Sequence, residues 1–194
     1  MPRVRCLLSK MAFGSLQTQE QRAAVEAQVC AESILRPQRS LPISWAQGEG
    51  YVELTQALRN VLGDDGLRAH FRRAYVEVSR SKLLGPLTDA YLRLYDQAPA
   101  GLARGAPRGW KLMSDGMGEL STSISSSGEA RIQYTYDPQL DDRTGTLPLC
   151  FAGTFDGFFD RCGIADGRCL VANLDAKTGT ATFVLPAARS MMKS

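Results

Sequence analysis

The chain has 194 residues, the usual length of one domain, and its composition of 44% hydrophobic and 22% charged residues excludes wholesale disorder. Lys and Arg exceed Asp and Glu by only 23 to 20 and the basic residues are scattered, so we expect neither nucleic-acid binding nor a charged membrane-binding surface. The longest weakly polar stretch, residues 145–155, is far shorter than the roughly 20 residues of a membrane-spanning helix, so no membrane span is predicted.

Cysteine usage and the first residues of the chain both favour the cytoplasm. The basic residues near the N-terminus are not followed by an apolar run of signal-peptide length, because Ser9 and Lys10 interrupt it. A disulfide framework is not expected, because the number of cysteines is odd and they are spread along the chain. We therefore predict a cytoplasmic protein with buried free thiols at Cys6, Cys30, Cys150, Cys162 and Cys169.

Capping residues and prolines define the first predicted helix. Thr18 and Gln21 form a capping pair, and alanines follow them, which predicts a helix over residues 18–35. The helix is expected to end before Pro37, and residues 36–45 to form a connecting loop.

Two more helices are predicted on either side of Gly63. Apolar residues at helical spacing indicate a helix over residues 50–62, and Gly63 can adopt the positive φ that ends it. Asp64 offers a capping oxygen to the next helix, which continues to about residue 80. Its arginines lie off the apolar stripe, so a solvated face is expected for Arg68, Arg72, Arg73 and Arg80.

Helices over residues 86–95 and 100–113 complete the helical part, and the periodicity then changes. Period-two alternation bounded by Gly and Ser turns predicts two hairpins, with strands over residues 119–124, 130–136, 168–174 and 180–185.

A phenylalanine-rich helix is predicted between the hairpins, over residues 149–162. Gly153 and Gly157 lie four residues apart and form a small-residue surface that we expect to press against a sheet. Asp156 and Asp160 are expected to mark the outer face of this helix.

These elements predict an α+β fold in which N-terminal helices pack on a four-stranded antiparallel sheet made of two hairpins separated by a helix. One domain is expected over residues 1–185, with a helical half over 14–113 and a hairpin–helix–hairpin half over 116–185. Residues 186–194 are predicted to be a flexible tail.

The spacing of glycines, aromatic residues and apolar residues in the C-terminal part resembles a known superfamily. The segments that carry the resemblance are residues 109–112, 118–120, 150–158 and 179–184. The superfamily includes heme nitric-oxide-binding sensors, 4-vinyl-reductase domains and subunits of a trafficking complex, and the chain is most similar to an uncharacterised myxobacterial family of that fold. The resemblance covers most of residues 10–185 and implies the fold more than any activity.

The chain departs from the cofactor-binding members of this superfamily. Heme sensors carry an axial histidine on a helix before the sheet and a Tyr-x-Ser-x-Arg motif, but here Tyr134 is followed by Tyr136 and Pro138 at the Ser and Arg positions. The only histidine, His70, comes too early for the axial role. The 4-vinyl-reductase relatives bear a cysteine pair near the final hairpin, which is missing from residues 175–183. No cofactor is therefore expected.

Catalytic and metal chemistry lack the residues they need. The closest cysteine spacing, Cys162-x6-Cys169, does not supply the paired ligands of a structural zinc site. A Ser or Cys nucleophile would have to use His70 as its base, and the sequence assigns no nucleophile to it. We expect a surface or half-buried helix histidine, kept neutral by neighbouring arginines. An enzyme is accordingly the third choice, and its chemistry would be unknown.

A set of aromatic side chains keeps a binding function open, because relatives of this fold hold ligands between helices and sheet. The residues expected to line such an apolar cavity, with Trp45 as a further member, are Trp110, Tyr75, Tyr91, Cys150, Phe155 and Phe159. Core packing is the alternative for each aromatic residue. For Cys150 the alternatives are an inert buried thiol and an acylated cysteine such as trafficking relatives carry.

Our leading hypothesis is a non-catalytic sensory or regulatory module that accepts a small apolar ligand and passes the response to a protein partner or a homodimer mate. The alternative is a protein–protein interaction module with a filled core and no ligand.

Overall fold

The structure, a computed structural model, describes residues 1–82, 84–95, 99–141, 144–164 and 167–186. The predicted flexible tail lies outside the described residues except for Pro186. The prediction that residues 1–185 form one domain stays a prediction.

The N-terminal region contains more helices than the sequence predicts. β1 (Arg3–Arg5) leads into α1 (Cys6–Gly14), so the helical half begins at residue 6 rather than 14. The single predicted helix over 18–35 is wrong, because α2 (Gln19–Glu26) and α3 (Ala31–Arg39) replace it. Thr18 does cap α2, since its side chain accepts a hydrogen bond from the Gln21 amide.

The break between α2 and α3 depends on a distant residue. The Cys30 amide and the Ser33 hydroxyl each donate to the Glu53 carboxylate, both at 2.8 Å. This carboxylate, from the first half of the next long helix, lies at the start of α3 and holds its first residues, where negative charge is favourable. The residues around the start of α3 give no indication of such a cap. α3 then continues through Pro37, which the sequence predicts to lie in a loop.

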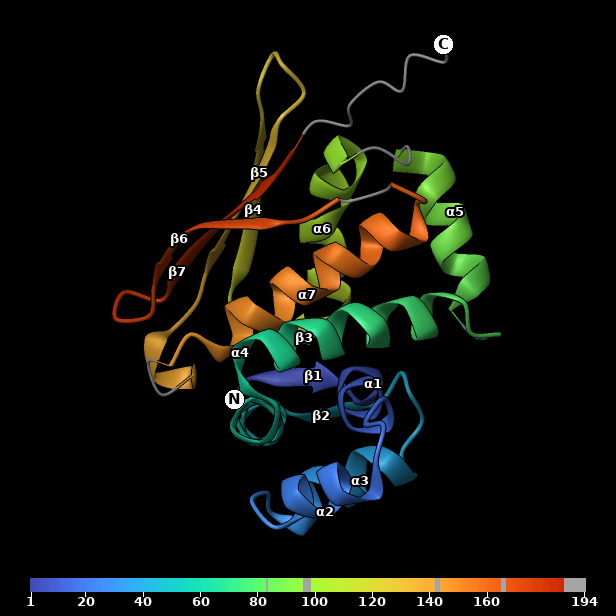
Figure 1. Cartoon of the computed structure of the whole chain (residues 1–194), viewed down its shortest axis with the longest axis vertical. Helices are drawn as coiled ribbons and strands as arrows, with labels where there is room; N and C mark the ends of the chain where they lie inside the picture. Colours follow the sequence, from blue (N-terminus) through green and yellow to red (C-terminus); the bar gives the residue numbers. More distant parts are fainter. Residues whose placement is uncertain (83, 96–98, 142–143, 165–166, 187–194) are drawn as a thin grey trace.

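The long helix α4 (Gly48–Ser79) is divided at Gly63 as predicted. Gly63 has φ 70° and ψ 175°, a conformation that only glycine adopts without strain. Figure 1 shows the two halves running in different directions, the first seen nearly end-on and the second across the view. The bidentate ion pair of Arg59 with Asp64 bridges the bend, with N–O distances of 2.6 and 3.0 Å.

Two sheets complete the fold. The predicted antiparallel sheet is confirmed, with strand order β4-β5-β7-β6 in the described part. A second sheet, with order β2-β1-β3, was not predicted because strands of two or three residues carry no readable alternation. The strands after β1 are β2 (Trp45–Gln47), β3 (Ser114–Asp115), β4 (Glu119–Ile124), β5 (Ala130–Thr135), β6 (Leu170–Asp175) and β7 (Thr180–Leu185).

The remaining helices lie close to their predicted positions. α5 (Gly85–Tyr95) and α6 (Pro99–Met113) pack on each other, and α6 runs along β4 and β5. A short 3-10 helix, η1 (Pro138–Asp141), precedes α7 (Thr146–Arg161). None of the described helices combines the length and the apolar composition that a bilayer crossing requires.

The glycine face of α7 packs on α4, not on the sheet as predicted. A Cβ on Gly153 would lie 2.3 Å from the Arg68 carbonyl oxygen, and one on Gly157 would lie 2.5 Å from that of Arg72. The prediction was wrong about the partner because small residues permit close approach to any backbone, and the second half of α4 occupies that side. The phenylalanine face of α7 covers the sheet, so α7 lies between the sheet and α4 (Figure 1).

Substitution of Gly153 by Ala should destabilise the fold by about 1–3 kcal/mol, because the added methyl group overpacks the helix–helix contact. Gly109→Ala in α6 is the matched control, since a Cβ there meets nothing within 4 Å. Alanine should stabilise that helical position by about 0.5–1 kcal/mol. Urea denaturation of both variants measures the difference, and a Gly153→Ala protein as stable as wild type would contradict the close contact.

Candidate functional site

An ion pair joins α4, α7 and the start of β6. Arg68 donates to both carboxylate oxygens of Asp156 at 2.7 and 3.1 Å and to the carbonyl of Cys169 at 2.5 Å. Asp156 also accepts the Cys169 amide at 2.8 Å. The expected outer-face position of Asp156 is wrong, because its side chain is only 3% exposed. The hydrogen bond to this carboxylate raises the pKa of Arg68, so its guanidinium stays charged.

Two further pairs repeat this pattern along α7. Arg72 binds both oxygens of Asp160, each at 2.5 Å, and the pairing lowers the pKa of Asp160. Arg161 pairs with Asp89 of α5. The expected solvated role therefore fails for Arg68 and Arg72, which tie α4 to α7.

Aromatic rings fill the space between α6, α7 and the sheet. Trp110 of α6 lies 4.8 Å from Phe151 of α7 and 6.2 Å from Tyr134 of β5, measured between ring centroids. Its indole N–H donates to the Gly118 carbonyl at 3.0 Å, which fixes the orientation of the ring. Phe155 meets Phe183 of β7 edge-on at 5.3 Å. We call these rings, together with Tyr136, the aromatic cluster: Trp110, Tyr134, Tyr136, Phe151, Phe155 and Phe183.

The members of the aromatic cluster differ in exposure. Trp110 and Phe151 are half-buried and form its rim, whereas Tyr134 and Phe183 are fully buried. Sequence reasoning missed Phe151 as a site residue, although its position in the phenylalanine-rich helix was a usable signal. It missed Tyr134 and Tyr136 because they were considered only as replacements for a heme motif.

The structure does not bring all the predicted cavity residues together. Only Trp110 and Phe155 belong to the aromatic cluster. Tyr75 packs against Gly157, and burial raises its pKa to about 12. Tyr91 lies on Gly105 of α6, and Phe159 is fully buried against Gly167.

Cys150 and Trp45 also lie apart from the aromatic cluster. Cys150 is buried near Tyr51, whose pKa is raised first by its own burial and then by this thiol, which fits the inert buried-thiol alternative. Trp45 lies in the three-stranded sheet β2-β1-β3, called the small sheet below. Its ring centroid is 3.7 Å from the guanidinium carbon of Arg5. All five cysteines are free thiols. The prediction of buried thiols is wrong for Cys30, which is exposed, and for Cys162, which is only half-buried.

His70 is a core residue, not a surface or half-buried one. Its side chain is 1% exposed, and Nε2–H donates to the Ala12 carbonyl at 2.7 Å. Nδ1 has no hydrogen-bond partner in the described part of the chain. Burial, followed by the nearby Arg73 charge, lowers the pKa of His70 below its ordinary 6.5, which supports the expected neutral state.

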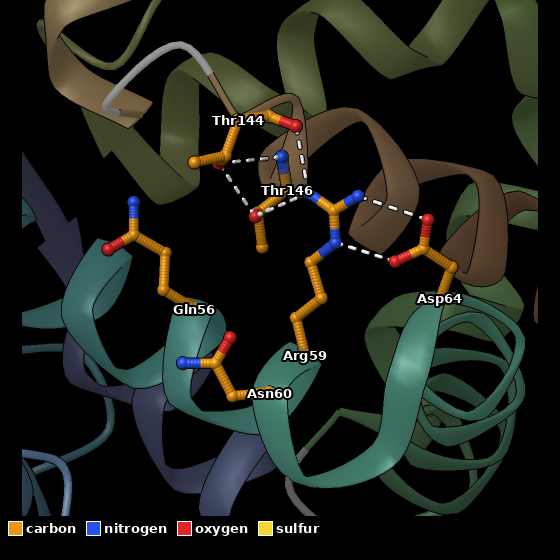
Figure 2. Close-up of a pocket in the computed structure, with 6 residues that line it drawn as sticks. All are labelled: Gln56, Arg59, Asn60, Asp64, Thr144 and Thr146. Atoms are coloured by element: carbon orange, nitrogen blue, oxygen red, sulfur yellow. Dashed lines mark hydrogen bonds and ion pairs between the residues drawn. The ribbon is translucent and has the colours of Figure 1, made fainter.

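A polar pocket of about 380 Å3 lies at the bend of α4, lined by Gln56, Arg59, Asn60, Asp64, Thr144 and Thr146. Figure 2 shows Arg59 reaching from α4 toward Thr144 and Thr146, with Asp64 on its other side. Arg59 donates to the Thr144 carbonyl at 2.7 Å and to the Thr146 hydroxyl at 3.2 Å. Because the guanidinium is engaged by Asp64 and by the start of α7, we assign it a structural role in holding the bend.

The described residues contain no group of three or more His, Cys, Asp or Glu side chains arranged to hold a metal ion. No protein-family model matches the sequence. No curated protein matches it either.

Solved structures do match nearly the whole chain. A mutant H-NOX protein from K. algicida in the unliganded Fe(II) form is 11% identical, with a TM-score of 0.65 over 96% of this chain and 98% of that one. An H-NOX protein from S. oneidensis in the Fe(II)NO state is 9% identical, with a TM-score of 0.65 over 95% and 99%. The chain has the H-NOX fold. An oxygen-binding H-NOX domain related to soluble guanylate cyclases also aligns, at 9% identity and TM-score 0.56 over 97% and 96%. Such low identity shows the fold alone.

The side chains present in this H-NOX fold do not fit a heme. α6, the helix before the four-stranded sheet, contains no histidine, and the single imidazole is bonded to α1. Tyr136 occupies the expected Ser position and stacks on Tyr134 with centroids 4.8 Å apart. Pro138, at the expected Arg position, has no side-chain donor for a propionate.

Replacing Arg68 by Met should lower the free energy of unfolding by about 2–3 kcal/mol. The Asp156 carboxylate would stay buried without its cation, and the loss falls below the 3–5 kcal/mol of a fully buried pair because Arg68 is 29% exposed. Arg131→Met breaks a pair whose side chains are 62% and 38% exposed and should cost under about 0.5 kcal/mol. Urea denaturation tests both, and equal losses would show that Arg68 contributes no more than a surface charge.

Stability should fall as the pH drops below about 6.5, the pKa of histidine in the unfolded chain. Since the pKa of folded His70 is lowered, the unfolded state binds more protons in this range, and the loss continues until the folded imidazole is protonated. Urea denaturation between about pH 7.5 and 5.5 should show a slope of up to about 1.4 kcal/mol per pH unit. His70→Gln should remove that slope, and an unchanged slope in this variant would rule out His70 as its origin.

Proposed function

We propose that this chain is a non-catalytic sensory or regulatory module of H-NOX fold that accepts a small apolar ligand at the aromatic cluster. The observation that supports the proposal is the half-buried rim of the cluster, where Trp110 and Phe151 meet between α6 and α7. Rings at such a rim offer apolar contact area to a ligand while remaining reachable from solvent.

The fold supports a sensory role without defining the ligand. The neighbouring structures are H-NOX proteins in Fe(II) and Fe(II)NO states and an oxygen-binding domain related to guanylate cyclases. In this chain Tyr136 and Pro138 stand at the Ser and Arg positions of the heme motif, and α6 has no histidine, so we propose an apolar molecule instead of a gas bound to iron. The cytoplasmic location and the relationship to a myxobacterial family remain parts of this proposal.

Signal transfer is proposed to run through α6. Trp110 reaches the aromatic cluster, and its carbonyl accepts the Ser114 hydroxyl at 3.1 Å. Ser114 belongs to β3, so a movement of Trp110 would shift a strand of the second sheet, β2-β1-β3. A protein partner or a second copy of the chain would receive the response.

The alternative is an interaction module with a filled core and no ligand. The packing of the inner rings favours this alternative, because Tyr134, Phe155 and Phe183 are nearly or fully buried, with Phe155 against Phe183 and Tyr134 against Phe151. The two functions differ in whether the rim of the cluster opens to admit a molecule.

Native mass spectrometry of freshly purified protein, compared with its denatured mass, distinguishes them. The sensory function predicts an additional small-molecule mass in the native wild-type protein and its loss in Trp110→Ala. Trp45→Ala is the matched control, because Trp45 is also half-buried but lies outside the aromatic cluster. It should retain the mass.

Urea denaturation must show that both variants remain folded, since removing a large ring costs about 3–5 kcal/mol when it is fully buried and less at a half-buried rim. If Trp110→Ala unfolds, Trp110→Phe, which keeps an aromatic ring, replaces it in the mass comparison. Identical native and denatured masses for the wild-type protein would contradict ligand binding and support the interaction module. A strong Soret absorption band would contradict the exclusion of heme.

A further inference from the structure

The outer face of the small sheet carries an unusual group of side chains. Arg3 pairs with Gln47 and with Asp115 in the strand register, and Arg5 pairs with Trp45. These side chains share one face, because residues at alternate positions of a strand point to the same side. The other face, with Val4, is buried in the core.

Arg5 is held rigidly on this face. Its Nε donates to the Leu112 carbonyl at 3.2 Å, and its Nη1 donates to the Ile43 carbonyl at 2.6 Å. The guanidinium carbon lies 3.7 Å from the centroid of the Trp45 ring, and that of Arg3 lies 5.2 Å from it. Both arginines therefore cover Trp45, and Arg5 has no carboxylate partner among the described residues.

Two of the residues that contact this fixed charge through their backbone carry exposed aliphatic side chains. The carbonyls that Arg5 binds belong to Ile43 and Leu112, which are 71% and 67% exposed, and Leu41, two residues before Ile43 in the chain, is 67% exposed. Isolated exposed leucines are ordinary, but three large aliphatic residues beside a stacked Arg–Trp pair are typical of an interface. We call this the Trp45 surface: Arg3, Arg5, Leu41, Ile43, Trp45 and Leu112.

The unpaired positive charges of the Trp45 surface favour a partner that carries acidic groups. Arg3 is balanced by Asp115, whereas Arg5 and the exposed Lys111 beside Leu112 have no ion-pair partner in the part of the chain that the structure describes. Arg5 still has N–H groups not used by the two carbonyls, and a guanidinium fork suits a carboxylate. The occupant should therefore bring acidic groups together with apolar side chains.

Two other occupants fit less well. A second copy meeting this surface through a two-fold axis would place like charges together, which costs free energy when they are desolvated. A membrane would engage Trp45 through its apolar ring, but the arginines cover that ring.

We propose that the Trp45 surface docks an acidic amphipathic helix of a partner protein, with its apolar residues on Ile43 and Leu112 and a carboxylate on Arg5. Trp110 and Leu112 share the last turn of α6, so the surface adjoins the aromatic cluster. Docking on the Trp45 surface does not require a ligand at the aromatic cluster. The docking proposal is therefore independent of the proposed ligand function.

The test uses the full chain and a synthetic helical peptide with leucines at positions i, i+3, i+4 and i+7 and glutamates elsewhere. Its comparator has lysine in place of every glutamate. Fluorescence anisotropy should show that the chain binds the glutamate peptide at least about tenfold more tightly, and that added salt weakens the complex.

The double variant Ile43→Ser/Leu112→Ser should lose at least about tenfold in affinity, because both apolar contacts are removed. Leu94→Ser/Leu170→Ser is the matched control, since these leucines are 80% and 58% exposed on α5 and β6, and it should bind as wild type does. All four residues are exposed, so both variants are expected to fold.

Three results would overturn the proposal. The first is equal or absent binding of the two peptides. The second is cosedimentation of the chain with phosphatidylglycerol vesicles, lost in the Ile43→Ser/Leu112→Ser variant, which would make the surface a lipid site. The third is a wild-type dimer in analytical ultracentrifugation that becomes a monomer in the same variant, which would make it a contact between copies.

Discussion

The contact between α7 and α4 is the constraint on which the rest of the structure depends. Gly153 and Gly157 bring the two backbones so close that no side chain fits between them. The Arg68–Asp156 pair then fixes their relative position and holds the Cys169 backbone at the start of β6. Because Asp156 is buried, removing Arg68 would leave an uncompensated charge in the interior. The pair therefore joins α4, α7 and the start of β6 at one point.

The same arrangement decides which side chains fill the space between the helices and the four-stranded sheet. With its glycines against α4, α7 turns Phe151 and Phe155 toward β5 and β7. Trp110 enters from α6 and meets Phe151, so rings separate α6 from α7. The chain therefore shares a fold with H-NOX proteins, while aromatic side chains fill the space between its α6, α7 and sheet. Fold and interior chemistry are separate properties, because a scaffold tolerates many side-chain sets that fill the same volume.

Local signals predicted most elements correctly where the physical cause was local. Gly63 ends one helix by adopting positive φ, Thr18 caps α2, and the two hairpins form between strands joined by short polar turns. The failures have distant causes. The α2–α3 break is stabilised by Glu53, and the small sheet joins strands that begin at Arg3, Trp45 and Ser114. Within the candidate site, the sequence indicated Trp110 and Phe155, but it could not separate them from Tyr75, Tyr91 and Phe159, which pack elsewhere.

The sequence by itself determined the α+β class, the four-stranded antiparallel sheet and the shortage of coordinating side chains, because periodicity, turn residues and residue counts are local quantities. Only the tertiary structure decided that the glycines of α7 face a helix, that Asp156 and His70 are buried, and that Trp45 lies beneath two arginines. Each of these facts depends on which surfaces meet, and a stripe of small, charged or aromatic residues is compatible with several partners until the whole chain is packed.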